Sequence, residues 1–92
     1  MIVVNEVKEG YINKFRNKLY GLLCEREKNG EWEKFLDTLL IELLGFPEEV
    51  KSINYLTLYY KLSSLRYLDY KYFRNTIFEC MNLITKVDNN NE

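Results

Sequence analysis

Apolar side chains recur every three or four positions along the first third of the chain, which is the spacing of one face of an α-helix. This stripe consists of Val7, Tyr11, Phe15, Leu19 and Leu22 or Leu23. The spacing predicts a first helix over about 6–28, with Asn5 as its N-cap. The dipeptide Asn29-Gly30 follows directly, and it predicts the point at which this helix stops.

A broader apolar pattern predicts a second helix over about 30–44. Its buried face is expected to hold Trp32, Phe35, Leu36, Leu39, Leu40, Leu43 and Leu44. Gly45 and then Pro47 follow in the usual order for a helix end, because glycine tolerates the C-terminal cap conformation and proline cannot continue the helix. Residues 46–52 then connect the two halves of the chain, and we expect a short turn over 47–51.

A third helix is predicted over about 54–68, with Ser52 or Asn54 as its cap. Residues 53–60 are rich in β-formers and partly alternate, so a strand is the alternative there. The helical interpretation is favoured because the apolar positions continue without a break through Leu68, which is too long for a typical strand.

A fourth helix is predicted over about 70–87, with Asp69 as its cap. The three-and-four spacing runs through Phe73, Ile77, Cys80 or Met81, Ile84 and Val87. Four helices in 92 residues indicate an all-α fold, a compact four-helix bundle-like single domain over residues 1–87. Residues 88–92 are polar, and we expect them to form a disordered tail.

Histidine is absent from the sequence, which removes the commonest general base and the commonest metal ligand. Two cysteines without histidine do not complete a structural zinc site, and no glycine opens a phosphate-binding loop. The acids at 31, 33, 48 and 49 are at adjacent or alternate positions, which do not share a helix face. We therefore expect a non-enzymatic protein with no catalytic residue, no metal and no cofactor.

The two cysteines, Cys24 and Cys80, lie far apart in the sequence. The apolar start of the chain, residues 1–4, is too short for a signal peptide or a membrane span. We expect a cytoplasmic protein without membrane attachment, in which both thiols are free. A disulfide between the two cysteines is the alternative.

The net charge of −1 disfavours a protein whose main role is to neutralise phosphates. Residues 51–76 nevertheless carry five basic side chains against one acid, a balance of +4. The same segment is rich in tyrosine, at positions 55, 59, 60, 67, 70 and 72. A domain of this size cannot bury all of these rings together with the leucines at 56, 58, 62, 65 and 68. Some of the tyrosines should therefore reach the surface.

Three interpretations of this segment stay open. The tyrosines could be core residues whose hydroxyls reach water. They could form a protein interface, because tyrosine and arginine dominate binding hot spots. They could also stack on nucleic acid bases while the cations meet phosphates. For the second interpretation we predict a partner-binding site made of Tyr59, Tyr60, Arg66, Tyr67, Lys71 and Arg74, which would attract an acidic protein surface or a second copy of the chain.

Nucleic acid binding would take the form of a helix-turn-helix built by the third and fourth helices, which are separated only at Asp69. Tyr70, Lys71, Arg74 and Asn75 would then lie on the first turns of the recognition helix. The overall acidity of the chain makes nucleic acid the less favoured partner.

Four stretches of the sequence resemble small accessory proteins of phage-inducible chromosomal islands and related prophages of low-GC Gram-positive bacteria. They are KLYGLLCERE (18–27), WEKFLD (32–37), YKLSSLRYL (60–68) and YKYFR (70–74), and the similarity covers roughly residues 14–85. The resemblance implies a protein that binds a phage protein, such as a late-gene transcription activator or a packaging or capsid component, and thereby interferes with the phage. It assigns no functional residue.

Overall fold

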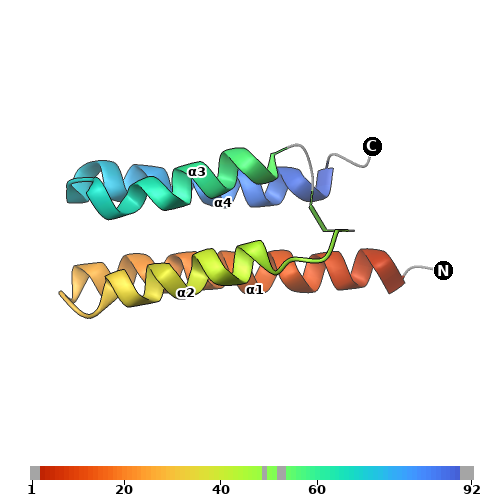
Figure 1. Cartoon of the computed structure of the whole chain (residues 1–92), viewed down its shortest axis with the longest axis horizontal. Coiled ribbons are helices and arrows are strands. Elements are labelled where there is room, and N and C mark those ends of the chain that lie inside the picture. Colours follow the sequence, from red (N-terminus) through yellow and green to blue (C-terminus); the bar gives the residue numbers. More distant parts are fainter. Residues whose placement is uncertain (1–2, 49, 52–53, 90–92) are drawn as a thin grey trace.

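Four α-helices and one short 3-10 helix make up the fold in a computed structural model of the chain (Figure 1). The structure describes residues 3–48, 50–51 and 54–89, and within these ranges it describes the side chains of residues 8–84. The elements are α1 (Val3–Glu27), α2 (Trp32–Leu44), α3 (Tyr55–Ser64), η1 (Leu65–Tyr67) and α4 (Tyr70–Asn89). The predicted all-α, four-helix bundle-like fold is confirmed.

The end of α1 is a Schellman motif at the predicted stop signal. Asn29 adopts a left-handed conformation with φ of 61°, which asparagine tolerates better than most residues. The Asn29 amide donates to the Arg26 carbonyl (3.0 Å), and the Gly30 amide donates to the Glu25 carbonyl (2.9 Å). At its other end α1 begins at Val3, so Asn5 lies inside the helix and the prediction that it is the N-cap is wrong.

The end of α2 and the turn after it follow the predicted pattern. Gly45 caps α2, and its amide donates to the Ile41 and Glu42 carbonyls. The expected turn over 47–51 is present, since the Val50 amide donates to the Pro47 carbonyl at 2.9 Å. Val50 is buried and closes the core at this end of the bundle.

The third helix is shorter than predicted, because its last turn tightens into the 3-10 helix η1. The hydroxyls of Ser63 and Ser64 donate to the carbonyls of Tyr59 (2.9 Å) and Lys61 (2.7 Å). Such bonds compete with the helical backbone pattern. Leu68 then adopts an extended conformation that ends the element. The strand alternative for residues 53–60 is wrong over 55–60, which are helical.

The fourth helix begins where the sequence predicted. Asp69 directly precedes α4, and its carbonyl accepts the first bond from the Phe73 amide at 2.8 Å. The helix extends to Asn89, so Asp88 and Asn89 of the expected tail are helical. Residues 90–92 and the side chain of Val87 lie outside what the structure describes.

The helices form two antiparallel hairpins, α1–α2 and α3–α4, stacked along one long axis (Figure 1). Helix α1 packs against α2 and α4, and α3 packs against the same two helices. The four helices therefore stand at the corners of a square, and the surface between α2 and α3 is opposite the surface between α1 and α4.

The core lies between the helices along this square. Its buried side chains are Ile12, Phe15, Leu19, Leu22, Leu23, Leu36, Leu39, Leu43, Phe46, Val50, Leu58, Leu62, Leu65, Phe73, Ile77, Cys80 and Ile84. Two leucines that were expected to be buried are not, since Leu44 is 54% exposed and Leu56 is 62% exposed. Tyr11 lies at the edge of its stripe and is also partly exposed. Both leucines were assigned to the core by spacing, but they lie on the outer side of their helices.

Arg26 contacts several elements at one end of the bundle. Its guanidinium lies 4.6 Å from the ring centroid of Trp32 and 4.5 Å from that of Phe73, and it donates to the Leu68 carbonyl at 2.9 Å. The Trp32 and Phe73 rings meet edge to face at 5.2 Å. One side chain from the last turn of α1 thus joins α2, α4 and the turn between α3 and α4, through cation–π contacts and a charged hydrogen bond.

Candidate protein-binding surfaces

The six residues predicted to bind a partner are divided between two sides of the bundle. Tyr60 and Tyr67 are 69% and 82% exposed on the outer side of α3 and η1. Lys71 and Arg74 are exposed on α4. The remaining two, Tyr59 and Arg66, are half-buried.

Two of the six residues already have contacts within the chain. Tyr59 packs against the core, and Arg66 donates to the Asp37 carboxylate of α2. Arg66 is therefore engaged in joining α3 to α2, and the structure does not bring it together with Lys71 and Arg74.

The first surface, here called the α2–α3 face, consists of Ile41 and Leu44 on α2 and Leu56, Tyr60 and Tyr67 on α3 and η1. Ile41 and Leu44 follow Asp37 by four and seven positions, so they lie on the same side of α2 as the Asp37–Arg66 pair. Leu56 and Tyr60 are likewise four positions apart on α3. All five side chains are more than half exposed, at 54–82%.

Two hydrogen bonds hold α2 and α3 at the α2–α3 face. The Tyr55 hydroxyl donates to the Leu43 carbonyl at 2.5 Å, near the end of α2. Arg66 joins Asp37 about two turns away along α2 and about three turns away along α3 and η1. The Tyr59 and Tyr60 rings pack edge to face with centroids 6.2 Å apart. The apolar side chains thus stand on a fixed two-helix platform.

The second surface, here called the α1–α4 face, combines cations with aromatic rings. It consists of Arg16, Tyr20, Tyr70, Lys71, Arg74 and Phe78. The Tyr70 hydroxyl donates to the Glu27 carboxylate of α1, which fixes how the two helices face each other. Tyr20 lies seven positions before Glu27 and Phe78 eight positions after Tyr70, so in this antiparallel pair both rings lie about 11 Å along the helix axes from that hydrogen bond.

The cations of the α1–α4 face have no acidic partner among the side chains that the structure describes. In the part of the chain that the structure describes, neither Arg16, Lys71 nor Arg74 forms an ion pair. Arg74 lies over the Phe78 ring at 5.1 Å. The buried Nε of Arg16 lacks an acceptor among the described residues. The acids on this side are Glu27 and Glu9, which lies seven positions before Arg16 on α1. The three cations exceed these two acids by one charge.

The hydrogen bond from Tyr70 to Glu27 also affects titration. It raises the pKa of the Tyr70 phenol above 10.0, because the neutral hydroxyl is the donor, and desolvation and the Glu27 charge act in the same direction. Arg74 and Arg26 oppose this shift. The phenol therefore stays neutral, and the positive balance of this face is kept through the physiological range.

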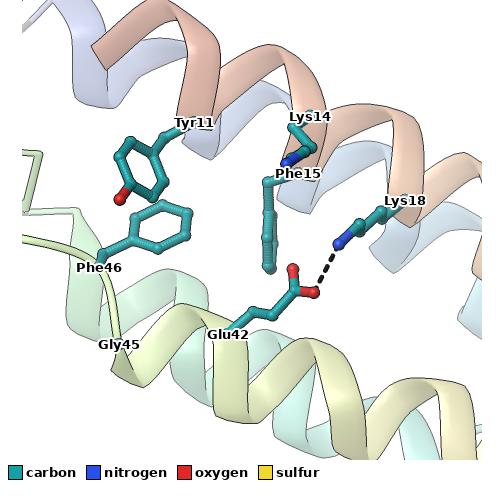
Figure 2. A pocket seen from close by; sticks show the side chains of 7 residues that line it. All are labelled: Tyr11, Lys14, Phe15, Lys18, Glu42, Gly45 and Phe46. Carbon is teal, nitrogen blue, oxygen red and sulfur yellow. Dashed lines mark hydrogen bonds and ion pairs between the residues drawn. The ribbon is translucent and has the colours of Figure 1, made fainter. Parts of the chain in front are cut away.

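A shallow cavity lies between α1 and α2, on a third side of the bundle (Figure 2). Its volume is about 280 Å³, and the Tyr11, Phe15 and Phe46 rings form its apolar wall. The Tyr11 and Phe46 rings are 5.2 Å apart. At its rim Lys18 and Glu42 form an ion pair at 2.5 Å, shown by the dashed line in Figure 2. Lys14 also lines the cavity and forms no ion pair among the described residues.

The described residues offer little reactive chemistry. Cys24 and Cys80 are both free thiols. Burial raises the pKa of the Cys80 thiol to about 12, which keeps it protonated and unreactive. Residues 3–48, 50–51 and 54–89 contain no group of three or more acidic or cysteine side chains placed to hold a metal ion. Over the same residues, none of the helices has the length and apolar character needed to cross a bilayer.

Several residues of the two faces were not predicted from the sequence to lie on a binding surface. Leu44 and Leu56 were missed because both were counted among the apolar residues expected to be buried, whereas Ile41 was assigned to neither side of its helix. Tyr20 was missed because it lies far from the tyrosine-rich segment in the sequence, and Phe78 was missed because it follows the end of that segment. A helical projection of α2 would have shown Ile41 opposite Leu39, which is the one signal available for it.

Comparison with protein-family models, with curated proteins and with solved structures gave no match to this chain.

Proposed function

We propose that this protein is a non-enzymatic, cytoplasmic regulator that binds an acidic surface of another protein through its α1–α4 face. The observation that supports the proposal most directly is a group of cations, Arg16, Lys71 and Arg74, that form no ion pair among the described residues and lie beside exposed aromatic rings. Arginine and tyrosine are enriched among the residues in which binding energy concentrates. Tyrosine buries much area with few rotatable bonds, and arginine forms several directed hydrogen bonds to a carboxylate.

The electrostatics indicate the chemistry of the partner. A carboxylate placed at the α1–α4 face would give the cations the ion-pair partner that they lack within the described chain. The positive balance would steer such a surface during the encounter. An acidic partner therefore fits this side of the bundle better than a basic or neutral one.

The biological process is proposed from the sequence resemblance. Residues 14–85 resemble accessory proteins of phage-inducible islands, so the proposed partner is a phage or host protein, and the proposed outcome is interference with phage late transcription or packaging. The arrangement of α3 and α4 favours protein over nucleic acid. They run side by side as an antiparallel hairpin (Figure 1), whereas the helices of a helix-turn-helix cross at about 90–120°.

The test compares two double variants that change the net charge equally. Lys71→Glu with Arg74→Glu alters the α1–α4 face. Lys28→Glu with Lys34→Glu alters exposed lysines elsewhere, whose side chains are 70% and 80% exposed. Proteins captured from prophage-induced cells are identified by mass spectrometry, and the purified partner is then titrated by calorimetry. We expect the first variant to bind at least about tenfold more weakly and the second to bind nearly as the wild type.

Circular dichroism and thermal melting of both variants show whether the fold is kept. Equal binding by the folded Lys71→Glu, Arg74→Glu variant would place the partner elsewhere on the bundle. A gel-shift series with duplex and single-stranded DNA at two salt concentrations forms the second arm. Tight, salt-dependent DNA binding that this same variant abolishes would replace the protein partner by nucleic acid.

A further inference from the structure

The α2–α3 face has a different chemistry from the proposed partner site, and a different occupant fits it. We infer that this face is the interface of a homodimer, in which two copies of the chain pack α2 and α3 against each other around a twofold axis. The inference does not depend on the proposed function, because the α1–α4 face lies on the opposite side of the bundle and stays free in such a dimer.

The exposed area is the first argument. The five residues of this face are largely exposed to solvent. Their exposed fractions are 70% for Ile41, 54% for Leu44, 62% for Leu56, 69% for Tyr60 and 82% for Tyr67. With about 200 Å² for one large side chain, they present on the order of 700 Å² of mostly apolar surface. Monomeric proteins rarely expose apolar patches larger than a few hundred Å². A stable interface buries about 800 Å² per partner, so these side chains nearly supply one interface.

The charge distribution is the second argument. Arg66 and Asp37 neutralise each other within the α2–α3 face, so two copies can meet there without repulsion between like charges. The further charges lie at opposite ends. Glu33 is exposed near the beginning of α2. Lys51, which also pairs with Glu48 at 3.5 Å, lies over the Tyr55 ring, 4.9 Å away, near the beginning of α3. A twofold rotation therefore brings Glu33 of each copy towards Lys51 of the other copy.

The order of the apolar side chains along the face is the third argument. Tyr67 stands at one end, Leu44 and Leu56 stand at the other end, and Ile41 and Tyr60 lie between them. Rotation about an axis near Ile41 and Tyr60 places Tyr67 of one copy over Leu44 and Leu56 of the other. The face is thus self-complementary in shape and in charge, as an isologous interface requires.

The first test is the mass of the protein in solution, measured by sedimentation equilibrium over a hundredfold range of concentration. We expect the wild type to approach twice the monomer mass at high concentration. Ile41→Glu with Tyr60→Glu should stay monomeric, and the fold should survive because both positions are about 70% exposed. The matched control is Tyr20→Glu with Tyr72→Glu, at positions 56% and 58% exposed off this face, and it should dimerise like the wild type.

Three results would overturn the inference. They are a wild type that stays monomeric at the highest concentration, a control variant that loses the dimer as fully as the α2–α3 variant, and an α2–α3 variant that keeps the dimer. If the chain is monomeric and the Ile41→Glu, Tyr60→Glu variant instead loses a captured protein, the occupant is a different protein.

The second test locates the axis without relying on stability. Ile41→Cys is made in a Cys24→Ser background, where the one remaining thiol is the buried Cys80. A residue near a twofold axis meets its own copy, so mild oxidation should give a covalent dimer of Ile41→Cys and little of Tyr20→Cys. Equal cross-linking of the two variants would show that the axis lies elsewhere. The cross-linked dimer should still bind the acidic partner through the α1–α4 face. A failure of the dimer proposal can therefore be distinguished from a failure of the proposed function.

Discussion

The α2–α3 face and the α1–α4 face lie on opposite sides of one core. Both expose apolar side chains, but the charged residues beside those side chains differ. On the α2–α3 face the one arginine, Arg66, is paired with Asp37 across the helices. On the α1–α4 face Arg74 has an aromatic ring beneath it and no carboxylate among the described residues. A neutral apolar surface suits a copy of itself, whereas a surface with excess positive charge needs a partner of opposite sign.

This difference could not be read from the local charge balance of the sequence. The positive balance of residues 51–76 is a property of the chain, but the fold distributes its cations over several surfaces. Arg66 faces α2, Lys61 pairs with Glu79 at 2.9 Å, and Lys51 lies near Glu48. Lys71 and Arg74 alone supply the excess to one face. Charge counted along a sequence therefore predicts a binding surface only where the same residues share a helix side.

The largest expected effect is a loss of folding stability, caused by a change in the core that underlies both faces. Leu39 is fully buried in α2, and Leu39→Ala should lower the free energy of unfolding by about 2–5 kcal/mol through lost contacts and a cavity. Ile41→Ala, two positions away and 70% exposed, should change monomer stability by less than about 0.5 kcal/mol. Urea unfolding at low protein concentration measures both. Equal losses would mean that Ile41 is buried in the monomer.

Salt should separate the two faces next. Raising the ionic strength from about 0.05 M to about 0.5 M should weaken acidic-partner binding at the α1–α4 face by about tenfold, because screening shortens the reach of its unpaired cations. The homodimer constant should change less than about twofold, since the α2–α3 face holds a neutralised ion pair. Calorimetry and sedimentation equilibrium give the two values. A dimer that dissociates in salt would contradict an apolar interface.

A charge reversal should sharpen the comparison within the α2–α3 face. Arg66→Glu places a like charge beside Asp37 and should cost about 1 kcal/mol of stability. The added change Asp37→Arg restores an opposite pair and should recover most of that loss. Thermal melting of the single and double variants gives the coupling between the positions. No recovery in the double variant would show that the pair does not join α2 to α3.

The smallest expected effect concerns pH at the α1–α4 face. The pKa of Tyr70 is raised in the folded protein, so the stability from its bond to Glu27 is fully present below pH 10.0 and is lost as the pH rises through the higher, folded pKa. Tyr70→Phe removes this contribution. The difference in melting temperature between wild type and Tyr70→Phe should therefore shrink above pH 10. A difference that grows with pH would reverse the assigned direction.

Most of the fold was predictable because it depends on local patterns. The Asn29-Gly30 stop, the Gly45 cap and the start of α4 after Asp69 are encoded by adjacent residues, and all three are confirmed. The shortened third helix was missed because its bounds were placed from the apolar spacing, which takes no account of Ser63 and Ser64. Their hydroxyls bond backbone carbonyls, and this effect is also local and could have been anticipated.

The surfaces were less predictable because they depend on which helices are neighbours. Spacing places Leu44 and Leu56 near apolar stripes, but only the packing of α2 beside α3 decides that both point outward. Tyr20 and Phe78 are 58 positions apart in the sequence, and no local pattern links them. Arg66 was predicted to bind a partner because the sequence does not show that the fold places Asp37 beside it. Whether the predicted residues bind a partner stays a prediction.

The packing of α1 against α4 has a consequence for how the chain is made. These are the first and last helices, and the Tyr70–Glu27 hydrogen bond joins residues 43 positions apart. At about 5–20 residues per second, a ribosome needs roughly two to nine seconds to add those positions. Throughout that interval α1 has no α4 to cover it, and at most its hairpin with α2 can form. The growing chain therefore exposes the side of α1 that carries Ile12 and Leu23, and this is the segment for which we expect a chaperone to compete during synthesis.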